Sequence, residues 1–428
     1  MTHPLELSTL VIDSGEVPEI LNRVTQEVSE LADDLAVVES FSHSYAWRGE
    51  DGLTVVDASG ALTGEAVVAA LRTWSTDPVS RLVYTHGHAD HVGGSPFFAA
   101  DAAARGRALP QVIAHENVAT RMDRYEATNV WNVLINRRQF GGVAADLGLS
   151  NGQSDARFLP EDTLRPDVEV GDFWSTTIGG ETVHFHHARG ETDDHLWTEV
   201  PDRKWIFSGD FLIWMYPNAG NPQKVQRYAL EWATALRAMV AREPELLLPA
   251  HGLPIEGRAR IATVLNDTAD TLEDLVRRVL ELMNAGATLD TIIHTVTVPD
   301  EVLAKPYLRP LYDEPEYSVR NIWRLYGGWW DGAASRLKPA PDAVLGAEIA
   351  ALVGGPQVLI ARALELAESD LRLACHLADF AGWAAPSDAG VHEGRAQIYS
   401  LRRNAELSLM SKGIYAAAAR ESKAVVKA

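Results

Sequence analysis

The sequence predicts an α/β domain in which helices cover β-sheets, followed by an all-helical domain. Up to about residue 260, short apolar runs alternate with glycine-containing turns and helical stretches, which is typical of sheets covered by helices. Beyond residue 260 the strand pattern stops, and long helical stretches rich in Ala and Leu follow. We therefore expect two domains, residues 1–260 and residues 261–428.

Composition narrows the function classes. A chain of 428 residues with 46% hydrophobic and 23% charged residues has the make-up of an ordinary globular protein. A formal net charge of −21 argues against nucleic-acid binding, which needs a basic surface. The single cysteine, Cys375, excludes an intramolecular disulfide. No basic start leads into an apolar run, and no 18 consecutive apolar residues occur, so we expect no signal peptide, no membrane span and a cytoplasmic protein.

Each element has its own local signal. Apolar runs bounded by Gly, Pro or Asp predict strands within 53–60, 81–86, 111–116, 182–191, 195–200, 204–210 and 245–252. Helices are predicted at 64–74 and after residue 92. In 270–286 apolar residues recur every three or four positions and Gly286 follows, which predicts a helix ending there. The stretches 356–383 and 393–422 are each predicted to be helical.

A dense group of metal-ligating side chains follows the run 81–85. The stretch HGHADH places His86, His88, Asp90 and His91 within six positions. Because side chains alternate along a strand, His86 and His88 can point the same way at its end, with the other two on the turn that follows. Three imidazoles and a carboxylate suit a divalent ion such as zinc, and their division between two sides of a turn favours two ions.

Three further ligand candidates occur where later strands meet glycine-containing turns. Glu191 ends the stretch 182–191, Asp210 follows WIFSG, and His251 lies in PAHG after the last apolar run. All three can converge on one edge of a sheet. Taken alone, each acid has an equal alternative to being a metal ligand: a surface carboxylate for either residue, or a helix N-cap for Asp210.

Together, the motifs THGHADHVGG, RGETDDH, SGD and PAHG resemble the metal motifs of the metallo-β-lactamase fold. Glu191 stands where most members carry histidine, and this resembles the alkyl sulfatase branch. The stretch 137–160 is similar to the active-site insertion of that branch, and YSVRNIWRLYGGWWDG (317–332) to its dimerisation-domain signature. The resemblance implies an αββα sandwich followed by a helical dimerisation domain, and therefore a homodimer.

The resemblance also implies two Zn²⁺ ions per chain. One zinc would lie on His86, His88 and Glu191, the other on Asp90, His91 and His251, with Asp210 bridging them. A metal-bound hydroxide would be the nucleophile, and Asp90 and Asp210 would be the catalytic carboxylates. His195, four residues after Glu191, and Asp57, which ends LTVVD, are candidates for supporting the ligands; a turn cap is an equal alternative for Asp57.

The stretch after Asp210 departs from the alkyl sulfatase pattern, which is polar there. It reads FLIWMYPNAGNP, and we expect at least one of Phe211, Trp214 and Tyr216 to face the reaction site as an apolar wall. The candidates left for binding an anion are Lys224, Arg227, Asn218 and Asn221.

Other aromatic and histidine side chains carry weaker signals. Tyr125, Trp131 and Phe140 surround the insertion and could line an apolar pocket, although aromatic residues are more often in a core. For His184, His186 and His187, packing is a better expectation than contact with the metals.

These observations lead us to expect a dinuclear zinc hydrolase that cleaves an ester-like or ether-like bond of a small, partly apolar molecule. The alternatives are a sulfate-ester hydrolase (alkyl sulfatase) proper, a lactone or carboxylic-ester hydrolase, and a metal-binding subunit of a larger complex with a further subunit. Every expected ligand position is filled, which favours an enzyme. The apolar stretch predicts weak activity on long-chain alkyl sulfates.

Overall fold

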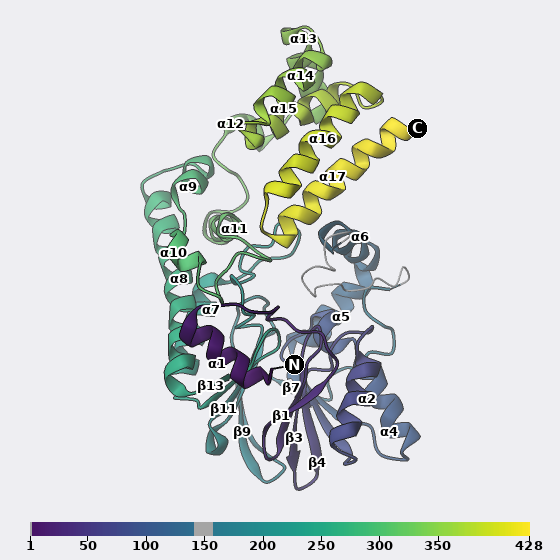
Figure 1. The fold of residues 1–428 in the computed structure, drawn as a ribbon, viewed down its shortest axis with the longest axis vertical. Helices are drawn as coiled ribbons and strands as arrows, with labels where there is room; N and C mark the ends of the chain where they lie inside the picture. Colours follow the sequence, from purple (N-terminus) through teal and green to yellow (C-terminus); the bar gives the residue numbers. More distant parts are fainter. Residues whose placement is uncertain (1, 141–156) are drawn as a thin grey trace.

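The protein is described by a computed structural model covering residues 2–140 and 157–428. Most of the predicted insertion at 137–160, namely residues 141–156, lies outside the described residues. Two stacked sheets with helices on both outer faces form the lower part of Figure 1, and a helical domain forms the upper part. The strands are β1 Val28–Ala32, β2 Leu35–Val38, β3 Ser44–Gly49, β4 Gly52–Val56, β5 Val79–Val83, β6 Gln111–His115, β7 Val168–Val170, β8 Phe173–Ile178, β9 Glu181–His187, β10 Leu196–Val200, β11 Trp205–Gly209, β12 Leu246–Pro249 and β13 Ile255–Glu256.

The helices of the sandwich and of the upper domain follow in chain order. They are α1 Pro4–Ser14, α2 Gly64–Trp74, α3 Ala89–Val92, α4 Ser95–Ala104, α5 Asn117–Ala127, α6 Asn129–Phe140, the 3₁₀ turn η2 Pro201–Arg203, α7 Ala229–Val240, α8 Arg258–Asn284, α9 Leu289–Thr295, α10 Asp300–Leu303, α11 Pro315–Gly327, α12 Ala334–Leu337, α13 Asp342–Val353, α14 Pro356–Leu366, α15 Leu371–Ala384, α16 Ala389–Ala405 and α17 Leu409–Lys427.

The first sheet runs β1 to β7 in chain order, antiparallel up to β4 and parallel from β4 to β7. The second sheet has the order β13-β12-β11-β10-β9-β8, with a parallel pair only between β11 and β12. Alternating side chains such as Trp47 and Phe207 fill the space between the sheets, while the opposite faces pack on helices. The predicted αββα sandwich is therefore confirmed.

This topology brings several strand ends to one rim of the sandwich. Strands β4 and β5 are parallel, so Asp57 and His86 follow them at the same end. In the second sheet β9, β11 and β12 run in one direction and lead into the segments carrying Glu191, Asp210 and His251. Backbone hydrogen bonds from His43 to Ala250 and from Leu196 to Thr85 join the two sheets at this rim, at 2.7 Å each.

The helical part confirms the predicted class but corrects two of the predicted helices. Residues 356–383 form α14 and α15, because Asp370 begins a new helix by accepting a hydrogen bond from the backbone N–H of Leu373. Residues 393–422 likewise divide between α16 and α17, where Ser408 caps the second helix by accepting from Ser411.

The helix α8 joins the two parts. It starts near the predicted boundary at residue 260, which stays a prediction, and its buried face shares one apolar core with α7 and with the second sheet. Among the described residues, no single helix has the length and hydropathy to cross a membrane. The pair α13 and α14, bent by 85°, meets the criteria of length and composition only when the two helices are taken together.

Candidate metal centre and active site

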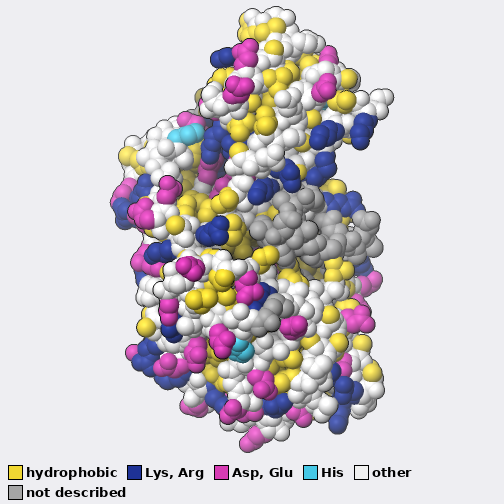
Figure 2. All heavy atoms as spheres, in the orientation of Figure 1, with side chains coloured by type: hydrophobic (Ala, Val, Ile, Leu, Met, Phe, Trp, Pro, Cys, Tyr) yellow, Lys and Arg dark blue, Asp and Glu magenta, His cyan; other side chains and the backbone are white. Residues whose placement is uncertain are grey.

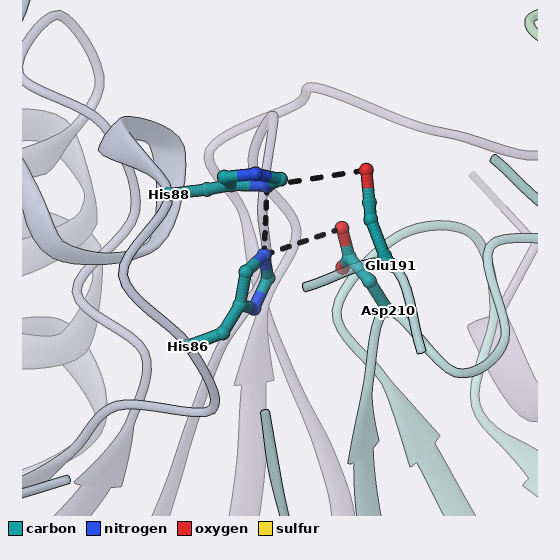
Figure 3. A group of neighbouring side chains, drawn as sticks. All are labelled: His86, His88, Glu191 and Asp210. Carbon is teal, nitrogen blue, oxygen red and sulfur yellow. Dashed lines mark hydrogen bonds and ion pairs between the residues drawn. The ribbon is translucent and has the colours of Figure 1, made fainter. Parts of the chain in front are cut away.

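Four of the predicted ligands meet where the loops from both sheets converge (Figure 3). His86 and His88 come from the loop after β5, Glu191 from the loop between β9 and β10, and Asp210 directly follows β11. His86 Nε2 lies 2.9 Å from His88 Nδ1 and 3.7 Å from an oxygen of Asp210, while His88 Nδ1 lies 4.0 Å from Glu191. One ligand atom from each residue therefore surrounds a common point.

A second group lies beside the first and shares Asp210 with it. His91 Nε2 lies 3.6 Å from Asp90 Oδ2 and 3.4 Å from Asp210 Oδ1, and His251 Nε2 lies 3.4 Å and 3.6 Å from the same two oxygens. Adjacent ligands of a tetrahedral zinc ion, with bonds of about 2.0–2.1 Å, are about 3.3–3.4 Å apart. These four spacings fit one ion, and the other oxygen of Asp210 faces His86, as a bridging carboxylate requires.

Hydrogen bonds fix the ring of His91 in the orientation that a metal ligand needs. Asp57, held in the left-handed region at φ 60°, accepts a hydrogen bond from His91 Nδ1 at 2.8 Å. The backbone N–H and the hydroxyl of Thr85 donate to the same carboxylate, both at 2.8 Å. With Nδ1 bonded to Asp57, Nε2 is turned toward Asp210 and is the nitrogen available to a metal ion.

His195 supports the site in a different way. The backbone N–H of Asp210 donates to His195 Nε2 at 3.2 Å, and the imidazole stacks on Phe211 with 4.3 Å between ring centroids. Burial lowers the pKa of His195 to about 3, so the ring is neutral. Its Nε2 lone pair is already used, which makes His195 a support for Asp210.

The charges and unpaired atoms of the cluster suit divalent cations. His91 Nε2 and Asp210 Oδ1 are buried and have no hydrogen-bond partner, a state that is costly unless another group binds there. Burial disfavours a charged His91, yet the carboxylates of Asp210, Asp57 and Asp90 raise its pKa well above the usual range. Burial lowers the pKa of His86 well below its usual value, which keeps that ring in the ligating form. The residues present therefore fit two metal ions.

A cavity of about 90 Å³ opens onto this cluster. Its floor consists of the ligand candidates His88, Asp90, Glu191, Asp210 and His251, and its remaining walls of Phe41, Ala89, Tyr125, Asn136, Phe140, Phe158, Ile213, Met215, Asn218, Asn221, Lys224, Arg227 and Tyr312. A larger cavity of about 390 Å³ lies in the helical domain among paired Arg, Glu and Asp side chains. Since the smaller cavity contains the ligand cluster, we place the site there.

The three aromatic side chains expected to form an apolar wall do not line this cavity. Trp214, at φ 55°, donates its indole N–H to the carbonyl of Leu253 at 2.7 Å. Tyr216 donates its hydroxyl to Ser318 at 3.0 Å, and Phe211 packs on His195. The loop turns so that these side chains join the core beneath it, while their neighbours Ile213 and Met215 face the cavity.

The predicted anion-binding side chains do line it. Arg227 is 1% exposed, and its guanidinium donates to the backbone carbonyl of Glu191 and lies 3.5 Å from the Glu191 carboxylate. Burial and the neighbouring Arg227 lower the pKa of Lys224 to about 8. Asn218 donates to Glu191, and the side-chain N–H₂ of Asn221 is buried without a partner.

The helical domain contributes to the same cavity. Tyr312 lines it, and its hydroxyl accepts from Gln139 of α6 at 2.6 Å. The buried carboxylate of Asp313 accepts from the backbone N–H groups of Gly220 and Asn221, at 2.6 Å and 3.1 Å. It thereby holds the loop that carries Asn218 and Asn221, two residues of the polar wall of the cavity. Tyr312 was not among the predicted site residues. No local motif marks it, and it lies far along the chain from the other lining residues.

Of the remaining aromatic and histidine candidates, some line the cavity and others pack elsewhere in the fold. Tyr125 and Phe140 line the cavity, whereas Trp131 does not and is 54% exposed. His187 stacks on His115 with 3.8 Å between ring centroids. His184 and His186 do not line the cavity.

The chain matches two family models. The metallo-beta-lactamase superfamily matches residues 37–251, and alkyl sulfatase dimerisation matches residues 288–424. The chain therefore belongs to the metallo-beta-lactamase superfamily and carries an alkyl sulfatase dimerisation domain. The resemblance inferred from the sequence motifs is confirmed.

Individual relatives share less than 30% sequence identity with this chain. The chain is 28% identical over 353 residues to a linear primary-alkylsulfatase of a Pseudomonas species, covering 77% of this chain and 64% of that protein. It is 22% identical over 335 residues to alkyl/aryl-sulfatase BDS1 of Saccharomyces cerevisiae, covering 74% and 51%. The structure of the stereoselective inverting sec-alkylsulfatase Pisa1 from Pseudomonas sp. matches with a TM-score of 0.80 at 21% identity, over 92% of this chain and 65% of that one. This chain thus spans about half to two thirds of the length of these proteins.

Proposed function

We propose that the protein hydrolyses sulfate esters of small alcohols at a centre of two zinc ions. The observation that supports this most is the composition of one cavity, whose lining combines Lys224 and Arg227 with apolar side chains and with the ligand cluster. A sulfate ester has the same two-sided character, with an anionic group and an apolar chain. The relatives named alkylsulfatases support the same choice.

The polar wall is suited to hold the sulfate group. The buried guanidinium of Arg227 is held by the Glu191 carbonyl, so little ordering is needed when an anion binds. Among the described residues, Lys224 Nζ has only Asn136 within hydrogen-bond reach, at 3.4 Å, which leaves donors for a sulfate oxygen. Within the same residues, the side-chain N–H₂ of Asn221 is a further donor without a partner.

The apolar wall is suited to hold the alcohol part. Phe41, Phe158, Ile213 and Met215 face the cavity from different segments of the chain. Because Phe211, Trp214 and Tyr216 belong to the core instead, the observation that favoured a neutral substrate over a sulfate ester no longer applies.

Two divalent ions held by the ligand cluster would supply Lewis acidity and would lower the pKa of a bound water. Asp210 keeps the two groups of ligands together, and Asp57 and His195 keep His91 and Asp210 in orientation. Burial disfavours an ionised Asp90, but His91 and His251 lower its pKa below the usual value, so its carboxylate is ionised beside the substrate. Hydrolysis consumes one water and releases the alcohol and hydrogen sulfate.

A pair of substrates with the same alkyl chain tests this proposal. Zinc-loaded protein should hydrolyse hexyl sulfate and leave hexyl acetate nearly untouched. In Lys224→Gln, kcat/KM for the sulfate should fall by about ten- to a hundredfold, the range for a lost hydrogen bond to a charged group. Lys338→Gln, which changes an exposed lysine of the helical domain, is the matched control and should act as the unmodified protein does.

Other outcomes have defined meanings. Faster turnover of hexyl acetate than of hexyl sulfate would replace the sulfatase with a carboxylic-ester hydrolase. Absence of turnover on both substrates and on lactones, with the metals in place, would favour a metal-binding subunit.

We also propose that the helical domain pairs two chains. Its family model carries dimerisation in its description, and apolar side chains of α13 and α14 are exposed, with Val344 60% and Leu352 74% accessible. Figure 2 shows hydrophobic side chains gathered on this upper part of the molecule. Exposed apolar surface of this kind is typical of a protein interface.

A further inference from the structure

A second group of ligating side chains lies on the outer face of the second sheet. His184 and His186 alternate along β9 and so point to the same face, and Glu199 on the neighbouring β10 pairs in register with His184. None of the three lines the cavity described above. Within the residues that the structure describes, they form a third cluster able to hold a metal ion.

The spacing of their ligand atoms matches a metal site. His184 Nδ1 lies 3.3 Å and His186 Nε2 lies 3.2 Å from the same oxygen of Glu199. Neighbouring ligands of a tetrahedral zinc ion are about 3.3–3.4 Å apart. All three ligand atoms lie within 4.8 Å of one another.

Aromatic packing holds the two imidazoles in place. The ring of His186 stacks on Trp197 with 3.8 Å between centroids and 8° between planes, and Trp197 is part of the buried core. Phe173 on β8 lies against both rings, with centroids 5.7 Å from His184 and 5.0 Å from His186. Ligands that are already ordered lose little conformational entropy on binding.

The cluster is also accessible from solvent. The side chains of His184, His186 and Glu199 are 27%, 13% and 10% exposed. Two histidines and one carboxylate form a known set of three zinc ligands, and solvent can supply the fourth.

We propose that His184 Nδ1, His186 Nε2 and the Glu199 carboxylate bind a third divalent transition-metal ion, such as Zn²⁺, separate from the two-metal centre. This site does not depend on the reaction proposed above. Its ion exchanges with solvent more readily than ions in the buried centre.

Arg242 provides a directional test of this site. Its Nε lies 3.6 Å from the same Glu199 oxygen, and its side chain is 47% exposed. The guanidinium therefore competes with a metal cation for Glu199, while its exposure allows it to move into water. Removing this charge should strengthen metal binding.

Zinc titration of the zinc-loaded, desalted protein tests the site by calorimetry. The unmodified protein should take up one further ion per chain. His184→Gln, His186→Gln and Glu199→Gln should each weaken this step by about tenfold or more, and Arg242→Gln should strengthen it. His294→Gln, which changes an exposed histidine 3.7 Å from Asp290 in the helical domain, is the matched control and should bind as the unmodified protein does.

Thermal unfolding provides a second readout that separates lost binding from lost folding. Without added zinc, the variants should unfold at the temperature of the unmodified protein, and added zinc should raise that temperature only where the site is intact. The proposal is overturned if no further ion binds to the unmodified protein, if the glutamine variants bind it equally well, or if Arg242→Gln does not bind it more tightly.

Discussion

Oδ1 of Asp210 lies 3.4 Å from Nε2 of His91, and within the part of the chain that the structure describes both atoms are buried without a hydrogen-bond partner. A buried carboxylate is costly unless positive charge lies beside it, and a metal ion bound by both atoms would supply that charge. The other oxygen of Asp210 faces His86 at 3.7 Å, so one side chain belongs to both halves of the cluster. This relationship distinguishes a bridging ligand from a helix cap.

Replacing the bridge tests that distinction. Asp210→Ala should lose at least one of the two ions and reduce turnover by about a hundredfold or more, because both halves lose a ligand. Elemental analysis and activity are the measurements, and far-UV circular dichroism checks the fold. Asp202→Ala removes an exposed acid from the turn η2 and should change neither the metal content nor the turnover. Full metal content with near-normal turnover in Asp210→Ala would show that Asp210 is only a cap.

Metal removal should destabilise the folded protein. The carboxylates of Glu191 and Asp210 are buried, and that of Asp90 is partly buried beside them. Ions that bind only the folded state stabilise it by about 4 kcal/mol at a thousand times their dissociation constant. Chelator should therefore lower the unfolding temperature, and zinc should restore it at two ions per chain. A content that stays at one ion after zinc reconstitution would contradict a dinuclear centre.

Sulfate-ester turnover should depend on the protonation of Lys224. Burial and Arg227 lower its pKa to about 8, so its ammonium is present below that pH and lost above it. Accordingly, kcat/KM for a sulfate ester should fall as pH rises through about 8. Lys224→Arg keeps its charge throughout and should move the fall to higher pH. An identical fall in both proteins would assign it to another group.

Trp214 should affect stability more than substrate preference. It is 2% exposed within the core, so Trp214→Ala should lower the free energy of unfolding by about 3–5 kcal/mol. Urea unfolding is the measurement. Trp329, 68% exposed, is the matched control, and its substitution by alanine should change stability by about 0.5 kcal/mol or less. A change in KM for Trp214→Ala without loss of stability would return this side chain to the substrate site.

Light scattering tests the pairing of chains. The protein should be a dimer at micromolar concentration, and Leu352→Glu on α13 should shift it toward monomer, since a charge would be buried in the interface. Leu109, 60% exposed on the sandwich, is the matched position, and Leu109→Glu should leave the dimer intact. If the unmodified protein is a monomer at this concentration, the proposal that the helical domain pairs two chains is wrong.

Local signals in the sequence were sufficient for much of the site. Glu191, Asp210 and His251 each follow a strand whose apolar run is readable, and strand ends converge by topology alone. Side chains alternate between the two faces of a strand with a fixed period of two residues. The loop after Asp210 has no such repeat, so its side-chain directions cannot be read from the sequence. The left-handed turn at Trp214 therefore reversed which side chains face the cavity, and no pattern marked it.

Other parts of the fold lacked such signals. No strand was predicted before residue 53, although β1 to β3 are three of the four strands in the antiparallel section of the first sheet. The breaks before α15 and α17 depend on single capping residues, Asp370 and Ser408, in stretches with continuous helical composition. Tyr312 reaches the cavity through packing between domains, which one-dimensional periodicity does not encode.

The hydrogen bonds that Asp313 accepts from Gly220 and Asn221 have a consequence for the nascent chain. Asp313 is separated from Gly220 by 93 positions, and Asn321 also holds this loop through the carbonyl of Ala219. Until residues 313–321 have been synthesised, the loop with Asn221 lacks the contacts with Asp313 and Asn321 that hold it. All the candidate metal ligands are therefore translated before the contacts that shape this wall of the cavity can form.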